Sequence, residues 1–307
     1  MYRILTDEDV EKLVSMKLVV NAIERTFEEQ ANGTLVSPPR FHLKTEQGDL
    51  VFTPGAATAV DKVIGFRVYD TYSDDLEGHQ QLVCVFDSDT GVFKGIVIGN
   101  LLGAFRTGAI GGVAIKAMAR RDAKRIAVIG TGVQARTQLE AALAVRDINC
   151  VRIFSRHPEH RAAFADHMMK KLDVEVLAVD SAKDCIQGAD IIICATNSGT
   201  PVFDLEWLKP GVHINTLGPK SMQRHEVPGE LGAVSSVIAT DSIEQLRAYP
   251  TPHFLVGTPE ERRIVQLGDI VNGDVPGRTG PNDITLFCSV GLSGTEVVVA
   301  NEILKEV

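Results

Sequence analysis

The sequence lacks a surplus of basic residues. Its 307 residues include 31 Lys and Arg against 40 Asp and Glu, a formal net charge of -9 at pH 7. Nucleic acids and anionic membranes attract proteins through concentrated positive charge, so we expect neither kind of partner. Hydrophobic residues make up 44% and charged residues 23%, which is the balance of a globular protein.

Cysteine is scarce, and no CxxC pair occurs among Cys84, Cys150, Cys185, Cys194 and Cys288. An odd set without metal-site spacing is typical of reduced thiols, and Cys194, inside the apolar run IIICAT, is predicted to be core packing. The first twenty residues mix acids and bases where a signal peptide needs an apolar core, and we find no apolar run of membrane-spanning length. These features predict a cytoplasmic location.

Metal sites are not expected either. The segment Asp87-Ser88-Asp89-Thr90-Gly91 resembles the start of a calcium loop, but the twelfth position, which needs an acid, is Ile98. A hairpin turn is the better interpretation. His157 and His160 have no partner ligands at metal spacing, so they are interpreted as surface histidines.

The length predicts two domains. Thr6 followed by Asp9 resembles a helix capping box, and apolar residues keep helical spacing as far as Phe27, with Gly33 ending the stretch. Short extended runs separated by turn signals follow, in the pattern of an antiparallel sheet. We place this first domain at residues 1–115.

From Lys124 onward, short β-branched runs alternate with helical segments that end near Arg146 and Lys171. This alternation predicts α/β architecture with about six parallel strands in a doubly wound Rossmann sheet, over residues 116–289. The last stretch, about 290–307, predicts a strand or turn followed by a helix that returns to the first domain.

The strongest motif is the G-x-G-x-x-A sequence formed by Gly130, Thr131, Gly132, Val133, Gln134 and Ala135. It follows an apolar strand and precedes a helical pattern, the context that a dinucleotide-binding loop requires. The first glycine permits the tight turn, the second lets backbone N–H groups approach a pyrophosphate, and the alanine allows close helix packing. Thr107 and Thr196 complete the predicted cofactor contacts.

The end of the second predicted strand indicates which dinucleotide binds. NAD-binding proteins carry an acid there for the adenine ribose, but this chain has Ser155-Arg156-His157. A guanidinium and a hydroxyl suit the extra phosphate of NADP, so NADP(H) is preferred and NAD(H) stays possible. The alternative is that Arg156 is an ordinary solvated residue at a helix start.

A long segment, LLGAFRTGAIGGVAIKAMARRDAKRIAVIGTGVQARTQLEA, closely resembles the signature region of the ornithine cyclodeaminase and mu-crystallin family. The similarity extends to SPPRF, to ADIIICATNSGTPVFDLEWLKPGVHINTLG and to GDIVNGDVPGRTGPNDITLFCSVGL. It implies a homodimer whose subunit has a discontinuous α+β domain for substrate binding and dimerisation, completed by the C-terminal helix. It also implies hydride transfer between a nicotinamide and the α-carbon of an amino or imino acid.

The resemblance assigns two carboxylate-binding residues, Arg40 in PPRF and Arg106 in AFRTG. Arginine suits the role because its planar fork pairs both carboxylate oxygens and orients the substrate. Two positions depart from the family. Arg67 stands where most members have a lysine, and it can bind an anion but cannot exchange a proton. Lys220 stands where the cyclodeaminase has an aspartate, which inverts the charge.

Lys220 has two open interpretations. It either replaces the missing lysine as proton donor or acceptor, or it binds a second acidic group of the substrate together with Arg67. His225 and Glu226, shortly after Lys220, either orient Lys220 or help to cap a helix. With Arg67 and Lys220 as catalytic candidates, the sequence predicts an NADP(H)-dependent oxidoreductase acting on an α-imino, α-keto or amino acid. The alternatives are a cyclodeaminase-type lyase that recycles NAD(H) internally and a non-catalytic NADPH-binding protein similar to mu-crystallin.

Overall fold

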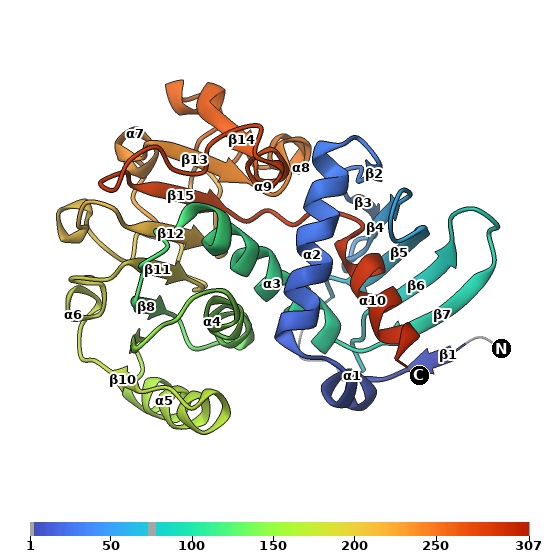
Figure 1. Cartoon of the computed structure of the whole chain (residues 1–307), viewed down its shortest axis with the longest axis horizontal. Helices are drawn as coiled ribbons and strands as arrows, with labels where there is room; N and C mark the ends of the chain where they lie inside the picture. Colours follow the sequence, from blue (N-terminus) through green and yellow to red (C-terminus); the bar gives the residue numbers. More distant parts are fainter. Residues whose placement is uncertain (1–2, 73–77, 307) are drawn as a thin grey trace. The chain divides into compact units, whose positions relative to one another are not determined.

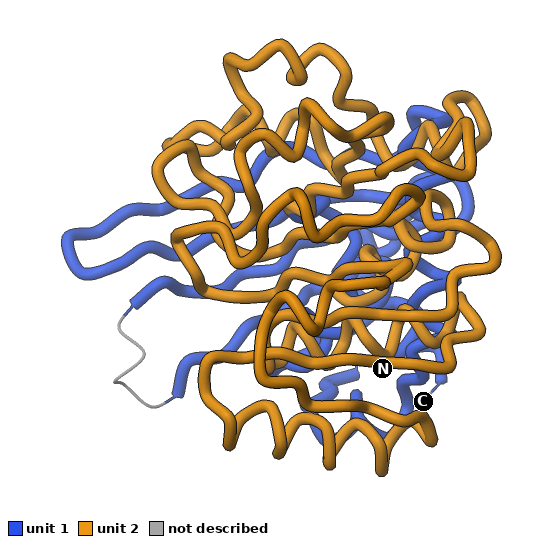
Figure 2. The backbone as a smooth tube through the Cα atoms, turned by 90° about the vertical axis from the view of Figure 1, so that its left-hand side faces the viewer, with its two compact units in different colours: residues 1–106, 291–307 blue, residues 107–290 orange. Residues whose placement is uncertain are grey.

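The computed structural model describes residues 3–72 and 78–306. The chain forms two compact units (Figure 2): unit 1 comprises residues 1–106 with 291–307, and unit 2 comprises residues 107–290. The sequence-based boundary, between residues 115 and 116, differs from the observed one, which falls between Arg106 and Thr107. Both lie inside one helix, α3 (Leu101–Met118). A continuous helix gives no local sequence signal for the point where its packing partners change.

The N-terminal helical stretch is two helices rather than the single one predicted: α1 (Asp7–Leu13) and α2 (Met16–Ala31). The Thr6 backbone N–H donates to the Asp9 carboxylate at 2.8 Å, as expected for a capping box. The Ser15 hydroxyl accepts from the Leu18 N–H at 3.2 Å and starts the second helix. Apolar spacing continues through both helices and conceals the break.

The sheet of unit 1 is antiparallel from β3 to β7, as predicted, and a short parallel strand is added at one edge. Its main path in spatial order is β1 (Arg3–Leu5), β7 (Phe93–Ile98), β6 (Leu82–Asp87), β5 (Val63–Asp70), β4 (Asp49–Ala57) and β2 (Leu35–Val36), while β3 (Phe41–Lys44) also pairs with β4. With only three and two residues, β1 and β2 give no readable alternation pattern.

One face of this sheet packs against α10 (Thr295–Lys305), which also contacts α2 (Figure 1). Glycines on the strands allow the helix to approach. A Cβ atom added at Gly95 would lie 2.8 Å from Leu304, and one added at Gly65 would lie 3.2 Å from Val297. The last helix of the chain therefore belongs to the core of unit 1.

The opposite face of the sheet carries apolar side chains in cross-strand rows. One row joins Phe52 to Val68 and then to Leu82, and Phe41 pairs with Phe52 at its edge. Phe41 is 60% exposed. Cross-strand partners share one face of a sheet, so these residues form a continuous apolar surface. We call it the outer face.

Unit 2 contains a wholly parallel sheet of eight strands, not the six predicted. In spatial order they are β10 (Val176–Ala178), β9 (Cys150–Phe154), β8 (Arg125–Ile129), β11 (Ile191–Cys194), β12 (His213–Thr216), β15 (Thr285–Cys288), β13 (Val237–Thr240) and β14 (Ile264–Gln266). Strand β15 comes last in the chain but inserts between β12 and β13. Strand order depends on long-range pairing, which the alternation of elements does not reveal.

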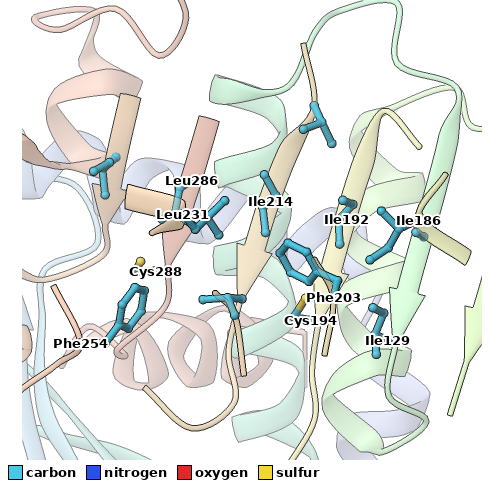
Figure 3. Close-up of a cluster of buried hydrophobic side chains, with 14 of the residues drawn as sticks. Ile129, Ile186, Ile192, Cys194, Phe203, Ile214, Leu231, Phe254, Leu286 and Cys288 are labelled. Carbon is cyan, nitrogen blue, oxygen red and sulfur yellow. The ribbon is translucent and has the colours of Figure 1, made fainter. Parts of the chain in front are cut away.

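Helices cover both faces of this sheet, as a doubly wound fold requires. They are α4 (Val133–Val145), α5 (Pro158–Leu172), α6 (Ala182–Ile186), α7 (Leu231–Val234), α8 (Ile243–Ala248) and α9 (Leu267–Asn272), with the 3-10 turns Leu205–Trp207 and Pro259–Arg263. Figure 3 shows one of the two cores, in which Ile192, Ile214 and Leu286 from neighbouring strands meet Phe203 and Leu231. The other core includes Val128, Leu139 and Phe164.

Helix α3 corrects one expectation. By length and composition it is apolar enough to cross a membrane, although no such run was recognised in the sequence. In the structure 72% of the helix is buried within the protein. Core helices of globular proteins pass the same test, because a helix that is apolar all round needs burial of some kind.

Candidate functional site

The glycine-rich turn lies between β8 and α4 in unit 2. Gly130 has a φ of +111°, a conformation that favours glycine, and a Cβ atom there would collide with the Ala195 carbonyl. Gly132 caps α4, and no atom lies within 4 Å of where its Cβ would be. The helix N-terminus therefore opens onto free space, as an anion-binding helix start requires.

A cavity of about 720 Å³ lies beside this turn. Most of the predicted cofactor contacts line it, namely Gly130, Thr131, Gly132, Val133, Gln134, Ser155, Arg156, His157 and Thr196. Two predicted contacts do not. Ala135 is buried in the core beneath the turn, and the Thr107 carbonyl accepts a hydrogen bond from the Gln138 side chain at 2.8 Å. Asn197, Ser198, Thr200 and His160 line the cavity without having been predicted.

The segment that follows β9 lines this cavity and contributes no acidic side chain to it. No Asp or Glu lines the cavity within the described residues. Arg161 donates to the Ser155 carbonyl at 3.0 Å, and its guanidinium lies 5.6 Å from the centroid of the Phe154 ring. His157 caps α5 and lies with its ring 5.0 Å from that of His160. The loop is thus held in shape while Arg156 faces the cavity.

A buried carboxylate, Glu226, organises the ends of β11 and β12, a role that differs from both roles considered for it from the sequence. One of its oxygens accepts from the Thr196 N–H and hydroxyl, each at 2.8 Å. The other accepts from the Thr216 hydroxyl at 2.8 Å, the Leu217 N–H at 3.0 Å and the Gly218 N–H at 2.6 Å. Because both strand ends bind the same side chain, Thr196 and Gly218 are fixed relative to each other.

Lys220 follows β12 and is half-buried. Its ammonium group donates to the Leu217 carbonyl at 3.0 Å and to the Ser289 carbonyl. A lysine ammonium has three N–H donors, so one remains for another partner. His225 forms a backbone bridge with Lys220, and its Nδ1 is 2.7 Å from the Val227 carbonyl. This contact fixes the His225 ring and does not involve the Lys220 side chain.

Unit 1 gathers the predicted substrate-binding arginines. Arg67 on β5 and Arg106 on α3 are both buried, and both bind one oxygen of Glu296 on α10, at 2.8 and 2.6 Å. The Arg67 guanidinium also lies 4.3 Å from the centroid of the Tyr69 ring. The anion that Arg67 binds in this structure is therefore a side chain of the protein itself.

Burial alone would raise the pKa of Glu296, but the charges of Arg106 and Arg67 lower it to about 2. The sequence analysis missed this residue. Its signal is an acid at a helical position whose neighbours, Val297, Val298 and Val299, are all fully buried. Lys, Glu, Arg and Asp are almost never fully buried unless they are paired.

Gly291 allows Arg40 to join this cluster. Its φ is +90°, and a Cβ atom there would collide with the Arg40 guanidinium and lie 3.6 Å from Arg106 Nη1. Arg40 and Arg106 thus converge on one glycine, although they are distant in the sequence. The three arginines form what we call the arginine cluster.

The sequence analysis assigned no catalytic role to the cysteines and no metal-binding role to the histidines. Burial raises the pKa of the Cys194 thiol well above its ordinary value, which suits core packing rather than nucleophilic catalysis. Within residues 3–72 and 78–306, no three His, Cys, Asp or Glu side chains are grouped so as to hold a metal ion. His157 and His160 contact each other through their rings.

The parallel sheet, the glycine-rich turn and the adjoining cavity of unit 2 define a dinucleotide-binding protein of the Rossmann class, and unit 1 contains an arginine cluster. The chain belongs to the ornithine cyclodeaminase/mu-crystallin family, whose model matches residues 2–307.

Three solved structures are similar over nearly the whole chain. The Δ1-pyrroline-2-carboxylate reductase of Thermococcus litoralis, in complex with NADH and L-proline, is 32% identical with a TM-score of 0.89, covering 99% of this chain and 96% of that one. An archaeal alanine dehydrogenase dimer with bound NAD is 27% identical (TM-score 0.89; 99% and 95% covered). The iminosuccinate reductase of Paracoccus denitrificans, in complex with NAD+, is 28% identical (TM-score 0.88; 99% and 96% covered).

Proposed function

We propose that this chain is an NADP(H)-dependent oxidoreductase that reduces α-imino acids, including imines formed from α-keto acids, or oxidises the matching amino acids in reverse. The observation that carries the proposal is the pairing of a dinucleotide cavity in unit 2 with a buried arginine cluster in unit 1. The first suits a nicotinamide cofactor, and the second suits a carboxylate. The three similar structures described above are named for imino-acid or amino-acid chemistry.

The cofactor would be held by the turn from Gly130 to Gln134, where the open space above Gly132 admits a pyrophosphate to the start of α4. A bound nicotinamide would supply or accept the hydride. Preference for NADP(H) rests on Ser155 and Arg156 in a cavity wall without an acid. Arg156 can clamp the extra phosphate through two parallel N–H bonds. NAD(H) remains a possible second cofactor.

Arg40 and Arg106 are proposed to bind the substrate carboxylate. Glu296 binds Arg67 and Arg106 through one oxygen, so it holds the two guanidinium groups side by side. It also orients the Arg106 guanidinium before substrate arrives, which lowers the cost of ordering the site. Arg67, which cannot lose its proton, would act through charge and through this shared carboxylate.

Lys220 is proposed to donate the proton during imine reduction. Two backbone carbonyls hold its ammonium group and leave one N–H free to reach a substrate nitrogen. The same arrangement disfavours the lyase alternative. An ammonium held in this way would repel a cationic ornithine side chain and has no lone pair to accept its proton.

We further propose that the chain forms a homodimer through the outer face of unit 1. Rows such as Phe52, Val68 and Leu82 would otherwise leave a contiguous apolar sheet face in water. Sedimentation analysis should show a dimer, and replacing Phe41 by Glu should shift it toward monomer.

We propose a cytoplasmic location and expect neither nucleic acid nor membrane as partner, because the net charge is -9.

The test is oxidation of NADPH and of NADH by the purified protein over cyclic imino acids and α-keto acids paired with ammonia or methylamine. Ammonia release from ornithine is followed in parallel. Net NADPH consumption is the expected result. Ammonia release without net consumption would replace the proposal with a lyase, and tight NADPH binding without any turnover would replace it with a binding protein.

A further inference from the structure

A second cavity, of about 340 Å³, lies in unit 2 beside Lys220. Ser221, Arg224 and Tyr249 line it together with Pro219, Pro250 and Thr251. None of these residues lines the dinucleotide cavity. The second cavity is walled by the segment after β12 and the segment after α8. Among its lining residues, the roles assigned above account only for Lys220.

The backbone around this second cavity is pinned on two sides. The Phe254 N–H donates to the Lys220 carbonyl and the Met222 N–H to the Pro252 carbonyl, each at 2.9 Å. Ser221 Oγ accepts from the Arg224 N–H at 3.2 Å, which closes the turn between them. The Tyr249 hydroxyl donates to the Val290 carbonyl at 3.0 Å. The wall is therefore formed before any ligand binds.

The charge of this cavity is positive and uncompensated. Its lining contains Lys220 and Arg224 but no acid. Lys220 donates only to carbonyl groups, and Arg224 has no side-chain hydrogen bond or ion pair with any residue the structure describes. Arg224 is exposed, so its guanidinium is accessible to a ligand, and beside a fixed ammonium group it suits one with negatively charged oxygens.

The neighbouring histidine supports this view of the electrostatics. His253 is fully buried and pairs through its backbone with Ser221. Burial, and then the charges of Lys220 and His225, lower the pKa of His253 to about 3. Its Nδ1 accepts from the Leu255 N–H at 3.2 Å, so the proton lies on Nε2, which has no partner in the described chain.

We propose that the cavity lined by Lys220, Ser221 and Arg224 is an anion subsite for a carboxylate on the substrate's side chain. The inference rests on the proposed function and narrows it to dicarboxylic α-imino acids. Arg224 binds both oxygens of the second carboxylate, and Lys220 contributes charge from the edge. The Ser221 hydroxyl donates to the Arg224 carbonyl at 3.3 Å and so holds the turn that carries Arg224.

A phosphate group of the cofactor is a second anion that Arg224 could bind. A Cβ atom added at Gly199 would lie 2.7 Å from Arg224 Nε, and the flanking residues Ser198 and Thr200 line the dinucleotide cavity. A phosphate of the cofactor is therefore the competing ligand for Arg224. The two sources differ in what they change: one alters substrate binding and the other alters cofactor binding.

The experiment compares Arg224→Gln with Arg262→Gln, an exposed arginine of the same unit whose loss changes net charge equally. NADPH oxidation is measured with ammonia and either oxaloacetate, which gives a dicarboxylic imine, or pyruvate, which gives a monocarboxylic one. Arg224→Gln should raise the KM for oxaloacetate roughly 10-fold to 100-fold, in line with the loss of a charged hydrogen-bonded pair. The KM for pyruvate and the Kd for NADPH should stay within about two-fold, and Arg262→Gln should change none of the three. Arg224→Lys should restore part of the loss.

Equal losses with both keto acids would overturn the subsite, and weaker NADPH binding with unchanged substrate KM would assign Arg224 to the cofactor phosphate. Calorimetric titration of succinate and acetate into the NADPH-loaded wild type and Arg224→Gln gives a readout that needs no turnover. Tighter binding of succinate that depends on Arg224 is expected. If no imine is reduced but this preference holds, the proposed function fails and the subsite stands, whereas turnover without the preference has the opposite meaning.

Discussion

Arg67 Nη1 lies 2.8 Å from a carboxylate oxygen of Glu296, although the two residues are 229 positions apart in the chain. Arg67, the residue at which the sequence departs from the family pattern, therefore has an ionic partner within the protein. An arginine that cannot lose its proton is tolerated inside unit 1 because a buried acid neutralises it. The same oxygen holds Arg106, so a change at any one of the three residues alters the other two.

Replacing Glu296 by Gln should destabilise the protein by about 3–5 kcal/mol, because it removes the carboxylate that two buried guanidinium groups share. Denaturant unfolding followed by circular dichroism measures the loss. Glu8→Gln is the control, since its side chain is 87% exposed and its pair with Lys12 is long at 3.9 Å. The double variant with Arg67→Met should recover part of the stability. A double variant no more stable than the Glu296 single variant would argue against the shared-carboxylate arrangement.

Replacing Arg106 by Gln should raise the KM for an imino acid roughly 10-fold to 100-fold, the value of a charged hydrogen-bonded pair, while the Kd for NADPH stays near normal. A lower kcat is also expected, because the carboxylate is no longer oriented. Steady-state kinetics and cofactor fluorescence separate the two quantities. Arg247→Gln, at an exposed pair with Glu261, is the control. Unchanged KM in Arg106→Gln would remove this arginine from the substrate site.

Replacing Arg156 by Asp should reverse the cofactor preference. Loss of the clamp and repulsion of the extra phosphate are expected to weaken NADPH binding about 10-fold to 100-fold, while NADH binding changes little. The ratio of the two Kd values is the measurement. Lys170→Asp, at the other end of α5, controls for a general change of charge on that helix. An unchanged ratio would identify Arg156 as a solvated surface residue.

Replacing Lys220 by Met should abolish turnover and leave NADPH affinity intact, because Lys220 does not line the dinucleotide cavity. Lys220→Arg keeps the charge but not the ability to exchange a proton. If Lys220 donates the proton, the arginine variant should be as inactive as the methionine variant. If it only binds an anion, the arginine variant should keep a measurable fraction of activity. Near-normal turnover in Lys220→Met would exclude both roles.

Stability should fall as the pH falls from 7.5 to 5.5. Burial is the main cause that lowers the pKa of both His213 and His253 to about 3, so the folded protein stays neutral at these two sites while the unfolded chain takes up protons near pH 6.5. Each histidine should lower the free energy of unfolding by about 1.4 kcal/mol over this pH interval. Glu296, with its pKa lowered to about 2, stays charged and should not contribute until the pH is below about 4.5.

Denaturant titrations at both pH values give the loss directly. His213→Gln is expected to lower stability at every pH and to remove its own share of the pH dependence. His167→Gln, on the exposed side of α5, should leave the slope unchanged. A wild-type unfolding free energy that does not vary between pH 7.5 and 5.5 would contradict the assignment of both histidines.

Local patterns in the sequence located most of the cofactor cavity. The glycine-rich turn and the end of β9 lie close in the chain to strands with clear apolar runs, and parallel pairing brings both to one edge of the sheet. Glu226 and Glu296 could not be found in this way. Their partners lie on other elements, and an acid in the sequence looks the same whether it is solvated or buried.

The same limit applies to strand order and to the division of the chain. The position of β15 between β12 and β13 depends on pairing between residues such as Thr216 and Cys288, which no local pattern records. The break between α1 and α2 had a signal, Ser15, that the continuing apolar period concealed. In both cases the apolar pattern of a local segment does not show how that segment packs against residues distant in the chain.

The close contact of α10 with its sheet also imposes an order on synthesis. Strands β4 to β7 leave the ribosome before unit 2, but the helix that covers their inner face follows unit 2 in the chain. During translation the inner face of these strands stays uncovered until the whole of unit 2 has been synthesised. Unit 1 is therefore completed only after unit 2 has been made, and a nascent chain truncated before Thr295 would expose that face to chaperones and proteases.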